Sequence, residues 1–221
     1  MLKAIIFDFD YTLGDSTNGI VLSVNYALEK LGFRIIDKEE IKKTVGLSLK
    51  DTYVALTMRD NREEAEQFSN YFKEKADLVM TENTELYRNV KEVLQNLKRE
   101  GYKVGIVTTK FHYRIEQIFN RFDALDLIDL IVGAEDVKIE KPNPEGLLWA
   151  IDNSRLEKDD ILYVGDSVVD AKTAENAQVK FAGVLTGTTT ADEFNLHRNV
   201  FIGETIEEVY SFIVSCAVKI E

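Results

Sequence analysis

The sequence contains almost no cysteine and no excess of positive charge. Cys216 is the only cysteine in 221 residues, so no disulfide forms within the chain and we expect a reducing compartment, the cytoplasm. Lysine and arginine number 27 against 39 aspartates and glutamates, which gives a net charge of −12. A chain this acidic lacks the basic surface that attracts nucleic acids and anionic membranes. We therefore expect no nucleic acid and no membrane as a partner.

Long apolar runs are missing as well. The longest one near the C-terminal end, residues 209–218, is too short to span a bilayer. Near the N-terminus, Asp8 interrupts the apolar run too early for a signal peptide. The hydrophobic content of 45% is nevertheless ample for a core. The length fits one large domain or a core with a smaller companion, and the sequence leaves open whether the protein is a monomer or a homodimer.

An unbroken apolar run, Ala4–Phe7, predicts a strand that is buried on both faces, as in a parallel sheet. The run ends in Asp8 and Asp10, whose side chains share a face because alternate residues of a strand do. Two neighbouring carboxylates repel each other. The pair therefore favours a cation site or a catalytic site over an ordinary solvated strand end.

Helical spacing replaces the strand pattern after Ser16. Helices are expected from about Ile20 to Gly32 and over residues 37–45, 48–56 and 62–79, with no strand before about Leu86. From there helices and strands alternate: helices over 90–99, 113–121, 144–153, 169–177 and 206–217, and strands over 103–107, 130–132, 161–164, 181–184 and 200–202. This alternation predicts an α/β fold with a doubly wound, mostly parallel sheet. We expect an α/β core of residues 1–15 and 86–221 and an inserted all-helical domain of residues 16–85.

Polar residues follow the strands of this expected sheet, where open α/β sheets bind ligands. Thr108 and Lys110 follow one strand, Asp166 and Asp170 follow another, and Lys141 lies between them in the motif Lys-Pro-Asn-Pro-Glu. Each has a purely structural alternative. The threonine and the two acids would cap helices or occupy first turns, and the lysine would be a surface residue before a helix. Together with the first two aspartates, they place acids, a hydroxyl and a lysine at one rim of the sheet.

In this order the motifs resemble those of the haloacid dehalogenase-like hydrolases, in the phosphatase branch with a helical cap and a Rossmann-like core. The stretch Asp8–Thr12 is similar to the first motif of that family, Thr108 to the second and Lys141 to the third. Residues 165–170, Gly-Asp-Ser-Val-Val-Asp, are similar to the fourth. The resemblance covers essentially the whole chain. Within the family it is closest to phosphoglycolate phosphatases, pyrophosphatases of the same type and β-phosphoglucomutases.

The resemblance implies a phosphohydrolase of small phosphorylated metabolites. Asp8 would be the nucleophile and would form an aspartyl-phosphate. Asp10 would protonate the leaving oxygen and then deprotonate the attacking water. Thr108 would bind a phosphoryl oxygen, and Lys141 would neutralise negative charge. The second aspartate also favours phosphate over halide chemistry, since a halide leaves without a proton.

The resemblance also implies a Mg²⁺ ion as cofactor. Its ligands would be Asp8, Asp166 and the main-chain carbonyl of Asp10, because oxygen ligands suit Mg²⁺. Asp170 would contribute through a metal-bound water or by holding another ligand. These four residues form the expected metal site.

Five further residues are expected to contact the substrate. Thr109 and Lys110 follow the second motif, and Gly46 and Lys50 lie in the loop that sets specificity in the family. Tyr11 stands where the family usually has glycine. It implies that the turn has ordinary dihedral angles, that its ring points toward the cap or the substrate, or that the ring simply packs under the cap.

Three other functions stay open at this point. A β-phosphoglucomutase-like phosphomutase would keep both aspartates, but the insertion lacks an obvious cluster of sugar-binding polar residues. A receiver-like signalling domain would also gather acids, a hydroxyl and a lysine at strand ends. The long insertion and the close acid pair speak against it. A catalytically silent binding protein would have no need of the full set of catalytic residue types.

Overall fold

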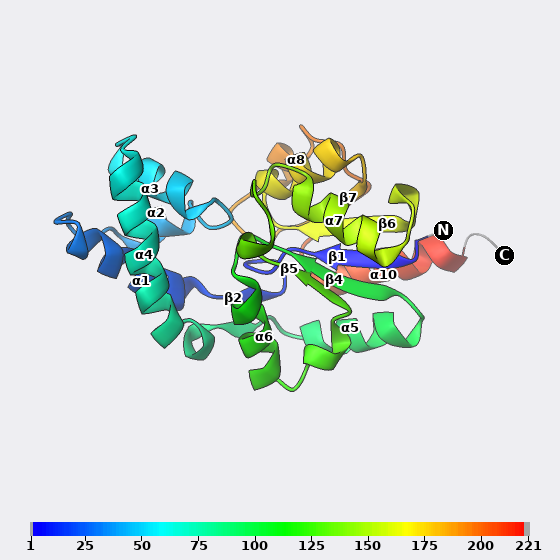
Figure 1. Cartoon of the computed structure of the whole chain (residues 1–221). Coiled ribbons are helices and arrows are strands. Elements are labelled where there is room, and N and C mark those ends of the chain that lie inside the picture. Colours follow the sequence, from blue (N-terminus) through cyan, green and yellow to red (C-terminus); the bar gives the residue numbers. More distant parts are fainter. Residues whose placement is uncertain (1, 219–221) are drawn as a thin grey trace. The chain divides into compact units, whose positions relative to one another are not determined.

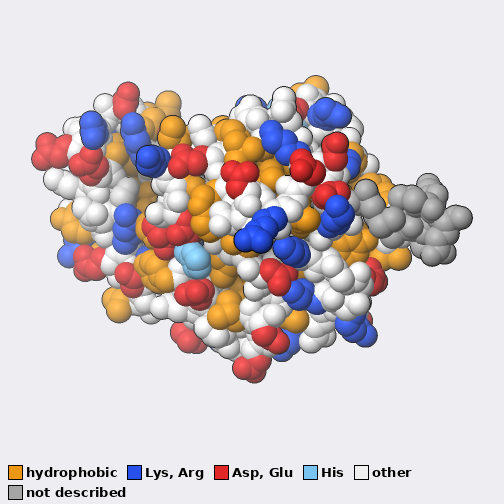
Figure 2. Space-filling model, turned by 45° about the vertical axis from the view of Figure 1, so that its right-hand side comes forward, with side chains coloured by type: hydrophobic (Ala, Val, Ile, Leu, Met, Phe, Trp, Pro, Cys, Tyr) orange, Lys and Arg blue, Asp and Glu red, His pale blue; other side chains and the backbone are white. Residues whose placement is uncertain are grey.

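The computed structural model describes residues 2–218 of the chain. The chain divides into two compact units, one of Met1–Gly14 and Leu86–Glu221 and the other of Asp15–Glu85 (Figure 1). Within the described residues, no helix is both long enough and apolar enough to cross a membrane. Acidic and basic side chains lie interspersed on the face that Figure 2 displays.

A parallel sheet of six strands forms the centre of the larger unit, in the order β5-β4-β1-β6-β7-β8. Its strands are β1 (Ala4–Phe7), β4 (Lys103–Val107), β5 (Leu130–Val132), β6 (Ile161–Gly165), β7 (Lys180–Val184) and β8 (Phe201–Gly203). Phe7 pairs with Ile106 of β4 and with Val164 of β6. The carboxyl ends of these three strands therefore meet at one edge. The predicted doubly wound, mostly parallel α/β fold is confirmed.

Two hydrophobic cores cover the two faces of this sheet. Successive residues of β1 alternate between them, with Ile5 and Phe7 in one core and Ala4 and Ile6 in the other. Helices α5 (Val90–Arg99), α6 (His112–Arg121) and α10 (Ile206–Val218) supply the first core, and α7 (Glu145–Ser154), α8 (Val168–Ala177) and α9 (Ala191–Phe194) supply the second. Figure 1 shows α7 and α8 on one side of the sheet and α5 and α6 on the other. Burial on both faces explains why β1 is apolar throughout.

Residues 15–85 form a helical unit with a core of its own. Its helices are α1 (Thr17–Lys30), α2 (Lys38–Lys42), α3 (Leu49–Thr57) and α4 (Arg62–Val79). The rings of Tyr53 in α3 and Phe68 in α4 lie 5.8 Å apart between centroids. Asn61 begins α4, because its side chain accepts hydrogen bonds from the backbone N–H groups of Glu63 and Glu64.

The sequence predictions omit the shortest elements. These are the paired strands β2 (Gly14–Asp15) and β3 (Glu85–Leu86), helix α9, and 3₁₀ turns at Thr81–Asn83, Leu125–Leu127, Ala134–Asp136 and Lys158–Asp160. Unlike the equally short strands β1 and β5, these elements contain no continuous apolar run that would mark them in the sequence. Helix α9 does have a local signal, since the Thr190 hydroxyl accepts a hydrogen bond from the Glu193 N–H in a capping box.

The helix predicted over residues 37–45 is too long. Helix α2 ends at Lys42, and the backbone N–H groups of Thr44 and Val45 bond three residues back, to Ile41 and Lys42, in turns. Gly46 follows with a φ of 91°. The helix thus ends three residues before the end predicted from the apolar pattern.

Candidate active site

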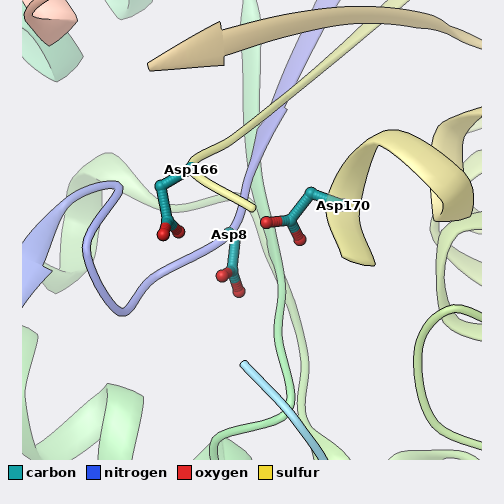
Figure 3. Close-up of side chains that lie close together, drawn as sticks. All are labelled: Asp8, Asp166 and Asp170. Carbon is teal, nitrogen blue, oxygen red and sulfur yellow. The ribbon is translucent and has the colours of Figure 1, made fainter. Parts of the chain in front are cut away.

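Three aspartates converge at the carboxyl edge of the sheet. Asp8 continues β1 and donates its backbone N–H to the carbonyl of Val164 at 2.8 Å. Asp166 directly follows β6, and Asp170 lies in the first turn of α8. Carboxylate oxygens of Asp8, Asp166 and Asp170 all lie within 4.8 Å of one another, and Figure 3 shows the three side chains close together. All three side chains are buried.

The start of α8 fixes the position of Asp170. Ser167 caps the helix by accepting a hydrogen bond from the Asp170 N–H at 3.2 Å. In return, Asp170 Oδ2 accepts hydrogen bonds from the Ser167 N–H at 3.1 Å and from its hydroxyl at 2.5 Å. A Cβ atom at Gly165 would lie 2.4 Å from Asp170, so glycine is needed there. Asp170 is therefore both a first-turn residue of the helix and part of the acidic cluster.

Lys141 is buried among these acids. Its Nζ lies 2.6 Å from Asp170 Oδ1, 2.9 Å from Asp8 Oδ1 and 3.1 Å from the Tyr163 hydroxyl. The structural alternative of a surface lysine is therefore wrong. Burial lowers the pKa of this ammonium, but the charges of Asp170 and Asp8 outweigh it and hold the pKa well above the usual value. Lys141 is thus a permanent positive charge at the cluster.

Two carboxylates of the cluster, those of Asp8 and Asp166, have raised pKa values because they are desolvated and close to other acids. Burial raises the pKa of Asp8 to about 6, against the opposing effect of Lys141. Burial, followed by the charges of Asp170 and Asp8, holds the pKa of Asp166 well above its usual range. Negative charge at this place is costly without a further cation. The cluster therefore has the chemistry of a metal site.

Two buried oxygens also lack a hydrogen bond. Asp8 Oδ1 and Asp10 Oδ1 have no hydrogen-bond partner among the described residues. Lys141 is within ion-pair distance of Asp8 Oδ1, but this contact does not have hydrogen-bond geometry. Buried polar atoms are rarely left unpaired. Carboxylate oxygens of Asp8 and Asp10 that lack a hydrogen bond fit a hard metal ion that prefers oxygen ligands.

Asp10 has different surroundings from Asp8. Its Oδ2 lies 3.0 Å from the Nζ of Lys110, and both side chains are buried. Thr108, the residue after β4, is also buried, and its hydroxyl accepts a hydrogen bond from the Lys110 N–H at 3.2 Å. The structural alternative of Thr108 as a helix cap is wrong, because α6 begins after Phe111.

Tyr11 occupies the conformation that glycine usually takes. Its φ is 59°, in the left-handed region, so the expectation of ordinary dihedral angles is wrong. The turn is held by a hydrogen bond from the Tyr11 N–H to the carbonyl of Gly14 at 2.8 Å, and the Thr186 hydroxyl donates to the Tyr11 carbonyl. The Tyr11 side chain is buried, with 4% of its surface exposed. The glycine-like turn is thus retained at a cost in backbone strain of about 1–2 kcal/mol.

Residues that the sequence predictions leave out also shape the site. The Thr12 hydroxyl donates a hydrogen bond to Asp166 Oδ1 at 3.1 Å, and a Cβ atom at Gly187 would lie 2.0 Å from Asp166 Oδ2. Tyr163 contacts both Lys141 and Asp170. Thr12 stands inside the first motif, which is its only signal in the sequence. Gly187 and Tyr163 have none, because their roles depend on the fold.

The remaining predicted substrate contacts fall into two groups. Thr109 lies half-buried between Thr108 and Lys110, in the loop that follows β4. Gly46 and Lys50 belong to the helical unit, Gly46 in the turn before α3 and Lys50 exposed in the first turn of α3. Substrate contact by these residues stays a prediction.

Known proteins resemble this chain in sequence and in fold. The family model of the haloacid dehalogenase-like hydrolases matches residues 5–184. The pyrophosphatase PpaX of Bacillus velezensis is 30% identical over 183 residues, which are 83% of each chain. The phosphoglycolate phosphatase of Cereibacter sphaeroides is 31% identical over 205 residues, covering 90% of this chain and 93% of the relative.

A solved structure gives the same answer. One from Bacteroides fragilis, described as a haloacid dehalogenase-like hydrolase, aligns with a TM-score of 0.92 at 39% identity and covers 95% of this chain and 100% of that one. The resemblance found in the motifs is confirmed by the match to the family model over most of the chain. The chain belongs to the haloacid dehalogenase-like hydrolases.

Proposed function

We propose that the protein is a Mg²⁺-dependent phosphatase of small phosphorylated metabolites, with Asp8 as its nucleophile. One observation carries the proposal: Asp8 and Asp10, two positions apart, have separate ammonium partners, Lys141 at 2.9 Å and Lys110 at 3.0 Å. Only Asp8 of the pair belongs to the acidic cluster. Two carboxylates held in different surroundings suit a reaction that needs one as nucleophile and the other as acid and base.

Oxygen ligands alone favour Mg²⁺ over softer metals. Held by Asp8, Asp166 and the main-chain carbonyl of Asp10, Mg²⁺ would supply positive charge to a phosphoryl oxygen and keep Asp8 ionised. Both oxygens of Asp170 already accept hydrogen bonds, Oδ1 from Lys141 and Oδ2 from Ser167. Asp170 is therefore best suited to orienting its neighbours or to binding through a water.

The reaction proceeds in two displacements. In the first, a carboxylate oxygen of Asp8 forms a bond to phosphorus while the bond from phosphorus to the leaving oxygen breaks, giving an aspartyl-phosphate. Lys141, buried at 2.9 Å from Asp8, offsets the charge that gathers on the phosphoryl oxygens. Thr108 supplies a hydroxyl at the end of the neighbouring strand β4.

Asp10 moves the protons in both displacements. As a carboxylic acid it gives its proton to the leaving oxygen. As a carboxylate it then takes a proton from the water that attacks the aspartyl-phosphate, so that inorganic phosphate leaves and Asp8 is restored. Lys110 orients the Asp10 carboxylate through their ion pair at 3.0 Å.

The substrate is proposed to be small and anionic. Lys110 and Lys50 are the proposed cations for an anionic leaving group, and Thr109 and Gly46 are further proposed contacts of the substrate. The helical unit, residues 16–85 in this proposal, would act as the cap that excludes water during the reaction. The curated relatives support this class of substrate, since their names specify phosphoglycolate and pyrophosphate hydrolysis. Tyr11, which is buried in the turn after β1, stays a proposed contact of the substrate.

A panel of phosphate monoesters and pyrophosphate, assayed with Mg²⁺ and with excess chelator, tests the proposal. We expect release of inorganic phosphate that depends on Mg²⁺ and returns when the ion is added back. Turnover that is unaffected by chelation would contradict the proposal. Transfer between sugar positions that needs a bisphosphate activator, with little phosphate release, would indicate the mutase instead. A stable phosphoaspartate without turnover would indicate a receiver-like domain.

A further inference from the structure

We infer that Tyr163 is a positioning residue for Lys141, whose ammonium its phenol group holds in place between Asp8 and Asp170. The inference rests on the proposed function, because that function assigns Lys141 to the reaction. Tyr163 lies on β6, outside the four sequence motifs. Its side chain is fully buried.

The side chain of Tyr163 reaches across the central strand of the sheet. Tyr163 pairs with Ile6 of β1, and β1 separates β6 from β4. The Tyr163 hydroxyl nevertheless donates a hydrogen bond to the carbonyl of Val107, the last residue of β4, at 2.9 Å. The phenol group thus connects the strand end that leads to Thr108 with the strand that leads to Asp166.

The hydroxyl oxygen also accepts a hydrogen bond from Lys141 Nζ at 3.1 Å. A second N–H of the ammonium goes to Asp170 Oδ1 at 2.6 Å. These two bonds hold the ammonium so that its positive charge lies 2.9 Å from Asp8 Oδ1, an ion-pair contact without hydrogen-bond geometry. Tyr163 therefore helps to fix the position of the positive charge beside the nucleophile and the phosphoryl group that it would carry.

Packing alone does not require the hydroxyl. The ring belongs to the second hydrophobic core and lies 6.4 Å from the Phe181 ring between centroids, a place that phenylalanine would fill. A buried hydroxyl is costly unless it is hydrogen-bonded. Here the phenol proton has two acceptors within reach, the Val107 carbonyl and Asp170 Oδ1 at 3.1 Å. Every polar partner of the hydroxyl is thus a residue of the site or the backbone directly before it.

The variant Tyr163→Phe keeps the ring and removes only the hydroxyl. With Mg²⁺ and a phosphate monoester that the wild type hydrolyses, we expect kcat to fall about 10-fold or more while KM changes less than about 2-fold. KM should change little because the hydroxyl does not contact the substrate. The kcat should fall because the Lys141 ammonium is no longer held in place during phosphoryl transfer. Tyr102→Phe is the matched control, a buried tyrosine of the other core, and should leave kcat unchanged. Thermal unfolding of both variants should stay cooperative.

A double-variant cycle separates positioning from a general structural effect. Adding Tyr163→Phe to Lys141→Arg should lower kcat by less than about 2-fold further, because the hydroxyl acts through the native ammonium. A wild-type kcat in Tyr163→Phe would overturn the inference, and so would an equal loss in both backgrounds. A wild type that hydrolyses nothing on the panel would instead refute the proposed function.

Discussion

The ammonium nitrogen of Lys110 lies 3.0 Å from a carboxylate oxygen of Asp10, and both side chains are buried. Lys141 stands in the same relation to Asp8, at 2.9 Å. Each aspartate of the first motif therefore has its own lysine, from a different segment of the chain. The two carboxylates differ because only Asp8 also belongs to the acidic cluster with Asp166 and Asp170, and this difference allows them different tasks.

Removing Lys110 should destabilise the fold. Lys110→Met leaves the buried Asp10 carboxylate without its partner, which costs about 3 kcal/mol of unfolding free energy. Urea denaturation without metal at neutral pH measures this loss. The double variant Lys110→Met with Asp10→Asn should recover part of it, because no unpaired charge stays buried. If the double variant loses as much unfolding free energy as the two single variants together, the ion pair does not have the role assigned here.

Replacing Asp10 should slow hydrolysis according to the leaving group. Asp10→Asn removes the proton donor, so we expect a loss in kcat of about 100- to 10,000-fold on alkyl phosphates. An aryl oxide leaves more readily without protonation, so Asp10→Asn should slow the first displacement less with an aryl phosphate than with an alkyl phosphate. Burst kinetics with both substrate types measure the difference. Equal losses in the first displacement for both would argue against Asp10 as the acid.

The pKa of Asp8 gives the metal-free protein a defined pH dependence. Burial raises this pKa from 3.8 to about 6, so between these values the folded chain binds more protons than the unfolded chain. The stability that Asp8 contributes is present at acid pH and is lost as the pH rises through about 6. Thermal unfolding without metal across this range should show the fall.

Mg²⁺ should reverse that loss. Because the ion binds ionised carboxylates, it should raise the melting temperature more at about pH 7.5 than at about pH 5. Asp166→Asn, which removes one proposed ligand, is the control and should largely abolish the increase. An increase of the same size at both pH values would count against binding at Asp8.

Much of the fold follows from apolar spacing. The strand Ala4–Phe7 and the helix Arg62–Val79 have the predicted bounds, because full burial and a long amphipathic face both leave clear patterns. The short elements β2, β3 and α9 contain no continuous apolar run and leave no such pattern. The left-handed turn at Tyr11 also escapes prediction. Its conformation is set by hydrogen bonds to Gly14 and Thr186, not by the preference of tyrosine.

Some residues of the site can also be predicted from the sequence, and others cannot. Acids that follow strands can be located from sequence, because parallel strands bring their carboxyl ends to one edge. The pairing of Lys110 with Asp10 depends on the shape of two loops and was not predicted. The substrate contact predicted for Lys110 stays a prediction. Tyr163 looks like any aromatic residue in a core strand. Only the sheet order shows that its hydroxyl reaches the neighbourhood of Lys141.

The central claim is that the phosphoryl group passes through Asp8. Asp10→Asn, mixed with Mg²⁺ and an aryl phosphate and then quenched in acid, should accumulate the aspartyl-phosphate, because the base that activates water is missing. Peptide mass spectrometry should find one phosphoryl group on the peptide that contains Asp8, and none when Asp8→Asn is added. A phosphoryl group on any other residue, or steady turnover by the Asp8→Asn protein, would contradict the account.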